Sequence, residues 1–217
     1  MNEILNGIIK NNDNFVNEHD KDFFKLHMAG QHPIITLVSC CDSRCHAHVI
    51  EPDPIDRIFT VETIGNQMVS AQGSVDYGIL HLHTPVLIIM GHTDCGAIKA
   101  FMKGYEKENE AIRRELDNLK GGLDPALDNK SVFDSELLKN IQKNVDYQVS
   151  LALERYKKPI EESALTVVGA IYDFLNALGK GYGRAVITSI NAQKDDAGIR
   201  TLARQADVGN CIGRVAY

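Results

Sequence analysis

The sequence predicts an α/β fold with a mostly parallel central sheet of about four strands plus an edge strand, flanked by helices. Short runs that are apolar throughout, such as IITLVS and VLIIM, alternate with segments of helical spacing. Continuous apolar runs are typical of parallel strands that are covered on both faces. Side chains that can bind a metal or take part in catalysis follow two of these runs directly. This is expected at the carboxyl edge of an open α/β sheet, where ligands bind.

The strand pattern recurs along the chain, bounded by glycine, proline or polar residues, and we expect right-handed crossovers between the parallel members. The predicted strands are 34–39, 58–61, 86–90, 165–172 and, as a further candidate, 185–190.

Helical spacing of apolar residues fills most of the intervening sequence. Residues 3–28 predict two short amphipathic helices, broken by the polar run 11–14. A long amphipathic helix is expected from about Ser135 to Lys157, ended by Pro159. The other expected elements are a helix over 74–83, a short helix and a loop with breakers Gly121, Gly122 and Pro125 within 103–136, and a helix around 199–206.

A chain of 217 residues with 44% hydrophobic content can bury one sizeable core, and we expect a single domain spanning residues 1–217. Within it we distinguish an N-terminal helical arm, 1–30, and a C-terminal extension, 175–217. The net charge is −6 and the basic residues are scattered, which argues against a nucleic-acid or anionic-membrane partner.

The sequence has no apolar stretch of the roughly 18 to 20 residues that cross a bilayer, and its N-terminus lacks the pattern of a signal peptide. We therefore expect a cytoplasmic protein. The chain has five cysteines, an odd number, and three of them lie close together at positions 40, 41 and 45. In a cytoplasmic chain this pattern indicates metal or thiol chemistry before a disulfide framework.

Two thiols and one imidazole follow neighbouring predicted strands. Cys40 comes directly after the first strand, and His92 and Cys95 come after the third. Such a set suits zinc, and three protein ligands leave the fourth tetrahedral position for water. Zinc can lower the pKa of that water toward about 7, which supplies hydroxide at neutral pH.

Asp42 and Arg44 lie just beyond Cys40, where Arg44 can keep Asp42 ionised by a bidentate contact. Asp42 can then orient the zinc-bound hydroxide, or move and compete with water for the metal. Spacing alone leaves three readings open: a catalytic zinc site, a structural zinc site, or unrelated buried cysteines. The fourth ligand of a structural site could come from Cys41, Cys45, Asp42 or His46.

The motifs CxDSR, at 40–44, and HxxCG, at 92–96, resemble the signature of beta-class carbonic anhydrases. The resemblance runs from about residue 3 to 173. It implies a Zn²⁺ cofactor on Cys40, His92 and Cys95, a catalytic pair of Asp42 and Arg44, and reversible hydration of carbon dioxide to bicarbonate by zinc-bound hydroxide. It also implies a homodimer or higher homo-oligomer, held partly by the N-terminal helices.

The substrate-binding residues follow from similarity to the plant-like branch of the family. Gln31 stands where that branch binds bicarbonate, and Gly96 where a glycine backbone faces the ligand. Phe59, Ile64 and Tyr77 stand where the branch lines its carbon dioxide pocket, with the tyrosine contributed by the partner subunit. From the residues alone, these last three could equally be ordinary core residues.

Two features depart from the family pattern. Glu62 begins the sequence ETIG where the family usually has Arg-Asn-Ala-Gly, and the extension 175–217 has no family counterpart that we can place. Two other functions also fit the ligand set. One is hydrolysis of carbonyl sulfide or carbon disulfide on the same scaffold, and the other is a non-catalytic structural-zinc or redox-sensing role.

Overall fold

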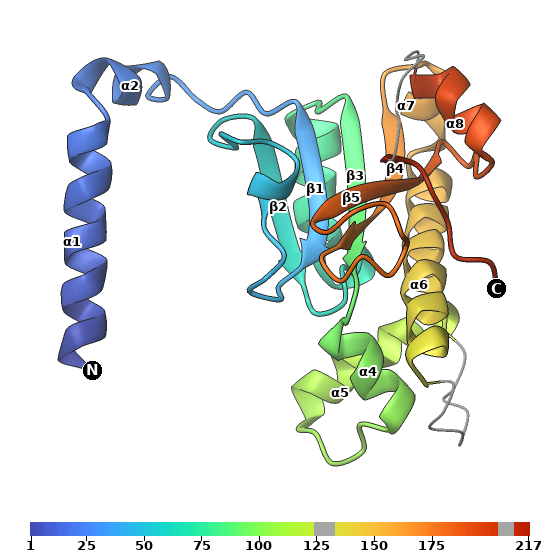
Figure 1. The fold of residues 1–217 in the computed structure, drawn as a ribbon. Helices are drawn as coiled ribbons and strands as arrows, with labels where there is room; N and C mark the ends of the chain where they lie inside the picture. Colours follow the sequence, from blue (N-terminus) through green and yellow to red (C-terminus); the bar gives the residue numbers. More distant parts are fainter. Residues whose placement is uncertain (124–132, 204–210) are drawn as a thin grey trace. The chain divides into compact units, whose positions relative to one another are not determined.

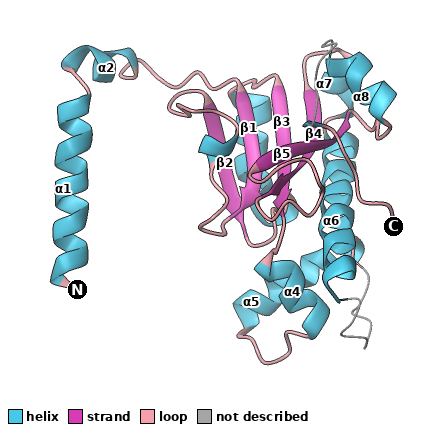
Figure 2. Cartoon of the chain, in the orientation of Figure 1, coloured by secondary structure: helices cyan, strands magenta, loops and turns pink. Residues whose placement is uncertain are grey.

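The computed structural model describes residues 1–123, 133–203 and 211–217. The chain divides into two compact units, Met1–His32 and Pro33–Tyr217 (Figure 1). The first unit is helical, and the second holds the β-sheet with helices around it (Figure 2). The prediction of a single domain over residues 1–217 stays a prediction.

The first unit consists of helices α1 (Asn2–Glu18) and α2 (Lys21–Leu26). The predicted break at 11–14 is wrong, because α1 continues through it. Asparagine costs a helix only a few tenths of a kcal/mol per residue. The break comes instead at Asp20, whose carboxylate accepts hydrogen bonds from the backbone N–H groups of Asp22 and Phe23 and so begins α2.

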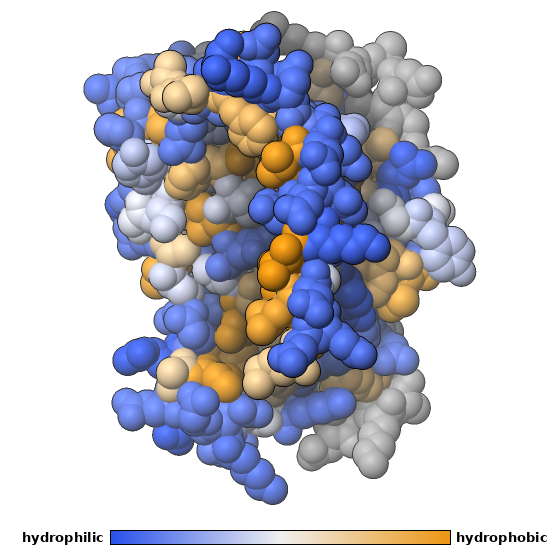
Figure 3. Space-filling view, turned by 90° about the vertical axis from the view of Figure 1, so that its left-hand side faces the viewer, coloured by the Kyte–Doolittle hydropathy of each residue, from blue (hydrophilic) through white to orange (hydrophobic). Residues whose placement is uncertain are grey.

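Neither helix buries a side chain within its own unit. Apolar residues of α1 are exposed beside hydrophilic ones, as the surface view shows (Figure 3). They are Ile4, Leu5, Ile8, Ile9, Phe15 and Val16.

The second unit is built on a five-stranded sheet in the order β2-β1-β3-β4-β5 (Figure 1). The first four in this order pair in parallel, and β5 pairs antiparallel to β4. The predicted fold class, a mostly parallel sheet flanked by helices, is therefore confirmed, and the fifth strand, β5, lies at one edge. The strands are β1 (Ile35–Cys40), β2 (Ile58–Thr63), β3 (Val86–His92), β4 (Thr166–Asp173) and β5 (Arg184–Ile190).

Helices and turns of the second unit connect these strands. The predicted helix over 74–83 is an α-helix followed by a π-helical turn. The α-helices are α3 (Gln72–Asp76), α4 (Gly96–Lys103), α5 (Glu110–Asp117), α6 (Phe133–Arg155), α7 (Lys157–Glu161) and α8 (Asp196–Ala203). The shorter turns are η1 (Ala47–Val49), η2 (Val69–Ala71), the π-helical η3 (Tyr77–His81) and η4 (Asn118–Gly121).

Pro159 does not end the long helix, contrary to the prediction. That helix, α6, ends at Arg155, since Tyr156 adopts φ −105° and ψ 27°. Pro159 instead lies in the first turn of α7, where a missing N–H costs no helical hydrogen bond. The predicted breaker Pro125 and the end of the predicted helix 199–206, beyond residue 203, lie outside the described residues.

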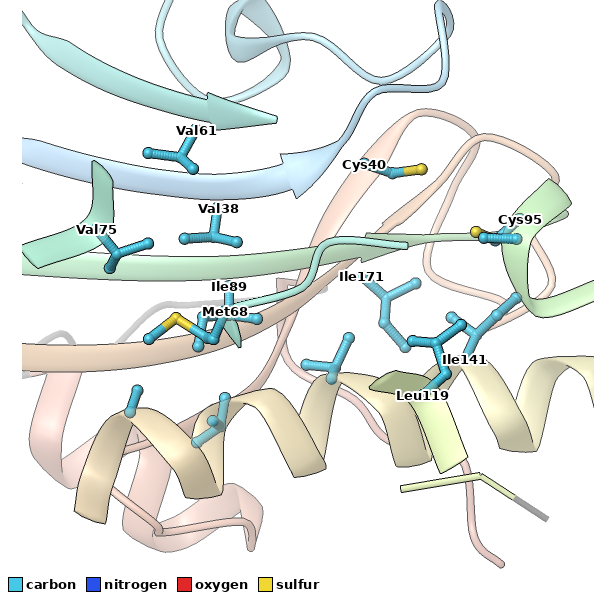
Figure 4. Packing of buried hydrophobic residues seen from close by; sticks show 14 of the residues in the cluster. Val38, Cys40, Val61, Met68, Val75, Ile89, Cys95, Leu119, Ile141 and Ile171 are labelled. Carbon is cyan, nitrogen blue, oxygen red and sulfur yellow. The ribbon is translucent and has the colours of Figure 1, made fainter. Parts of the chain in front are cut away.

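The main hydrophobic core lies between one face of the sheet and the helices. Helix α6 packs along β3 and β4, and its Ile141 points into this core (Figure 4). Val145 and Val149 of the same helix lie against Gly91 of β3 and Gly169 of β4. Strand residues alternate between faces, so Val38 points into this core while its neighbour Leu37 packs on the opposite face against Cys45 and Ala47. None of the helices in the described part of the chain is long and apolar enough to cross a membrane.

The end of the C-terminal extension packs on α6 through a buried carboxylate, Asp146. Its Oδ1 accepts a hydrogen bond from Arg214 Nη1 at 3.0 Å, and its Oδ2 accepts bonds from Arg214 Nη2, from Lys194 Nζ at 3.1 Å and from Tyr217 Oη at 2.5 Å. Burial raises the pKa of Asp146, but the bonds from Arg214 and Tyr217 outweigh it, so the net pKa is lowered. The carboxylate is therefore ionised and ties the extension to the core.

Candidate metal centre

Three possible metal ligands meet at the carboxyl edge of the sheet. Cys40 ends β1, His92 ends β3, and Cys95 is the N-cap of α4. Because β1 and β3 are adjacent and parallel, with Ser39 opposite Met90, their ends lie together. The two Sγ atoms and a ring nitrogen of His92 lie within 4.8 Å of one another, and all three side chains are buried (Figure 4 shows the two cysteines).

The hydrogen bonding of His92 leaves one nitrogen for a metal. Its Nδ1–H donates to the carbonyl oxygen of Thr93 at 2.9 Å, which fixes the lone pair on Nε2. That Nε2 is buried and has no hydrogen-bond partner among the described residues. A buried, unpaired acceptor is costly unless a ligand satisfies it, so the residues fit a metal ion.

The pKa values of the two thiols are shifted in opposite directions. The hydrogen bond with Cys95 is the largest influence on Cys40 and lowers its pKa to about 4, against the effect of burial. The same bond, with burial, raises the pKa of Cys95 well above its ordinary value. One thiolate is thus already favoured, and a divalent cation would displace the remaining proton.

The other candidate ligands from the sequence lie apart from this cluster. Within the described residues, only Cys40, His92 and Cys95 form a group that could hold a metal. Cys45 packs on the opposite face of the sheet, where burial raises its pKa to about 12. Cys41 is exposed, and His46 pairs its Nδ1 with that of His48 at 2.8 Å.

Asp42 and Arg44 form the predicted pair beside the cluster. Arg44 Nε donates to Asp42 Oδ1 at 2.9 Å, and Nη2 donates to Oδ2 at 2.7 Å. The backbone N–H of Arg44 also donates to Oδ1 at 3.0 Å. These bonds hold the pKa of Asp42 well below its usual range, and those from the guanidinium have the largest effect. Asp42 Oδ2 lies 3.8 Å from His92 Nε2, so an ionised carboxylate borders the candidate metal ligands.

Sequence reasoning missed Asp94 and Phe174, which contact Arg44, and Lys99, which pairs with Asp94. Asp94 Oδ2 accepts a hydrogen bond from Arg44 Nη1 at 3.1 Å, and its other oxygen pairs with Lys99. The ring of Phe174 lies 4.7 Å from Arg44 Cζ and stacks near the ring of His92, with centroids 6.0 Å apart. The position of Asp94 inside the HxxCG motif could have indicated a role at the site. The placement of Phe174, by contrast, depends on β4 lying beside β3.

The predicted substrate residues lie in different places relative to the Cys40, His92 and Cys95 cluster. Ile64 follows the residue paired with Cys40 and packs against the core that contains Cys40 and Cys95. Gly96 opens α4 with free space where a Cβ would stand. Phe59 and Tyr77 lie close together, with ring centroids 5.9 Å apart.

Phe59 is paired with Thr36, four residues before Cys40 on β1. At about 3.3 Å per strand residue, this places it roughly 13 Å along the strand from the ligands of its own chain. Gln31 belongs to the first unit, and its place at the metal site stays a prediction.

A family model described as carbonic anhydrase matches residues 35–178, which include all three ligands and the Asp42–Arg44 pair. The chain belongs to the carbonic anhydrase family. Carbonic anhydrase 2 of Mycobacterium tuberculosis is 37% identical over 73 residues, which are 33% of this chain and 35% of that protein. The carbonic anhydrase of Synechocystis is 28% identical over 138 residues, 54% of this chain and 50% of the relative. These alignments thus span about a third to a half of the relatives' lengths.

Solved structures of beta-carbonic anhydrases share the fold of this family member. CafA of Aspergillus fumigatus has a TM-score of 0.69 at 22% identity, over 94% of this chain and all of that chain. The beta-carbonic anhydrase CcaA has a TM-score of 0.69 at 20% identity, over 87% of both chains. A tetrameric enzyme from Sordaria macrospora has a TM-score of 0.68 at 21% identity, over 80% of this chain and 93% of that one.

Proposed function

We propose that the protein is a zinc-dependent carbonic anhydrase that reversibly hydrates carbon dioxide to bicarbonate and a proton. The observation that supports this most is a buried Cys-His-Cys set with an unpaired His92 Nε2, bordered by an ionised carboxylate. Membership of the carbonic anhydrase family supports the same reaction. Of the metals, zinc fits two thiolates and one imidazole best, with a fourth position left for the reaction.

In this proposal Cys40, His92 and Cys95 hold the zinc. When bound, the ion supplies a water that is acidic enough to ionise near neutral pH. Asp42 is kept ionised by Arg44, so it can only accept hydrogen bonds. It therefore orients whichever hydroxyl group lies at the fourth position.

The remaining predicted residues bind the substrate. The open space at Gly96 admits bicarbonate at the start of α4, and Gln31 donates a hydrogen bond to it. Ile64, Phe59 and Tyr77 supply the apolar surface that carbon dioxide needs. Because Phe59 lies far from the ligands of its own chain, it and Tyr77 would reach the site of a second subunit.

This arrangement requires at least a homodimer, and we propose a cytoplasmic homodimer or higher homo-oligomer. The exposed apolar residues of α1 support a protein partner for that helix. The Sordaria macrospora relatives, which share the fold, are described as tetrameric.

The test is stopped-flow hydration of carbon dioxide on protein of known zinc content, near pH 7 and near pH 8.5. We expect activity at both pH values, abolished in Cys40→Ala and reduced by about a hundredfold or more in Asp42→Asn. Cys211→Ala is the matched control, since this cysteine lies outside the ligand cluster. No hydration by a chain that binds one zinc would refute the proposal and favour carbonyl sulfide or carbon disulfide as substrate.

A further inference from the structure

The carboxylate of Asp94 is shared by two cations. Its Oδ2 accepts a hydrogen bond from Arg44 Nη1 at 3.1 Å, and its Oδ1 pairs with Lys99. Asp94 adopts φ 62°, a left-handed conformation that aspartate tolerates better than most residues. Its backbone carbonyl oxygen also accepts a bond from Arg44 Nη2, at 3.4 Å. Both polar groups of Asp94 are therefore directed to the guanidinium.

Arg44 therefore donates hydrogen bonds to two carboxylates. Its Nε and Nη2 bind Asp42, and its Nη1 binds Asp94. Phe174 lies against the guanidinium at 4.7 Å and limits the directions in which it can move. The attraction of Arg44 to either carboxylate depends on how far the negative charge of that carboxylate is already neutralised.

Lys99 neutralises only one of the two. It pairs with Asp94, whereas the ion-pair partners of Asp42 among the described residues are Arg44 and His92. Lys99 therefore weakens the electrostatic attraction between Asp94 and Arg44, so the guanidinium stays bound to Asp42. Without this lysine, Asp94 would draw Arg44 toward itself and Asp42 would lose its donors.

The release of Asp42 matters because of its position. Its Oδ2 lies 3.8 Å from His92 Nε2, the lone pair that would bind the metal. A carboxylate without its arginine can itself become a ligand and fill the fourth position. We propose that Lys99, acting through Asp94, is a positioning residue that keeps Asp42 on Arg44 and so keeps the metal site open. This inference rests on the proposed function.

The test compares Lys99→Met with the double variant Lys99→Met/Asp94→Asn, in which the competing charge is removed as well. Asparagine also tolerates the left-handed conformation of Asp94. Lys103→Met is the matched control, because it removes the same charge from the same helix, and its ammonium faces Phe133. Lys99→Arg tests rescue by the conservative charge.

Two readouts are needed. Hydration of carbon dioxide gives kcat and KM, and the visible absorption of the cobalt(II)-loaded protein reports the ligand in the fourth position without relying on turnover. For Lys99→Met we expect about a tenfold loss of kcat near pH 7, a smaller change in KM, and a cobalt spectrum that no longer responds between pH 7 and about 8.5. The double variant and Lys99→Arg should return both readouts to within about twofold of the unmodified protein.

A Lys99→Met variant with unchanged kcat and an unchanged cobalt spectrum would overturn the proposal. So would a double variant as impaired as Lys99→Met, or an equal loss in Lys103→Met. If Lys99→Met does not fold, Lys99→Gln takes its place. If the unmodified protein does not hydrate carbon dioxide, the proposed function fails, and the cobalt spectra still decide whether Lys99 controls Asp42.

Discussion

Replacing Arg214 by methionine should destabilise the fold through the buried carboxylate of Asp146. Arg214 donates two hydrogen bonds to Asp146 and one, at 2.9 Å, to the carbonyl oxygen of Thr188. The Asp146 side chain is only 7% exposed, so water cannot replace these bonds. Loss of the partner of a buried charge costs about 3–5 kcal/mol. Lys194 and Tyr217 remain as partners, so we expect about 2–3 kcal/mol.

For a chain of this size the change corresponds to about 4–12 °C in Tm. Thermal unfolding followed by circular dichroism at one protein concentration measures it, with Arg113→Met, an exposed arginine of α5, as control. The folded-state pKa of Asp146 is lowered, so its stabilisation is present above the unfolded pKa of about 4 and is lost as the pH falls through the folded value. The difference between Arg214→Met and the unmodified protein should therefore be full at pH 7 and shrink on acidification. A loss below about 1 kcal/mol at pH 7, or one independent of pH, would refute this reasoning.

Two further predictions concern packing and the metal. Gly78→Ala should cost about 1–3 kcal/mol in urea unfolding, because its Cβ would lie 2.3 Å from Thr36 Oγ1, which is fully buried. The matched Gly73→Ala, whose Cβ meets nothing within 4 Å, should instead raise stability by up to about 1 kcal/mol, and equal effects would contradict the packing argument. Removing the metal with a chelator should lower the Tm of the unmodified protein but not of Cys40→Ala, since binding to the native state alone stabilises it. An unchanged Tm of a demonstrably metal-loaded protein would count against a stabilising metal site.

The strands were predictable because each is a run of apolar residues that a parallel sheet buries on both faces. The predicted 86–90 and 165–172, for example, correspond to β3 and β4. The two errors in the helices were local. Polar residues at 11–14 do not break α1, and Pro159 fits the first turn of α7, because helix ends depend on capping and on tertiary packing as well as on composition.

The meeting of Cys40, His92 and Cys95 was predictable for a related reason. Cys40 and His92 end adjacent parallel strands, and Cys95 follows His92 by three residues. The environment of Arg44 was not predictable. Phe174 reaches it only because β4 lies beside β3, and Lys99 reaches Asp94 from the first turns of α4. The bond between Arg214 and Asp146 likewise joins distant segments, and nothing in the local sequence around either residue indicates it.

The position of β1 inside the sheet, between β2 and β3, has a consequence during synthesis. In chain order β1 comes first, but in the sheet it lies between β2 and β3, and β3 carries His92 and is followed by Cys95. As the chain leaves the ribosome, Cys40 therefore emerges well before the strand that completes its surroundings. Loop closure between β1 and β3 must precede the joining of the ligands. Until β3 docks, Cys40 stands without His92 and Cys95, so the three-residue set exists only after this part of the sheet has formed.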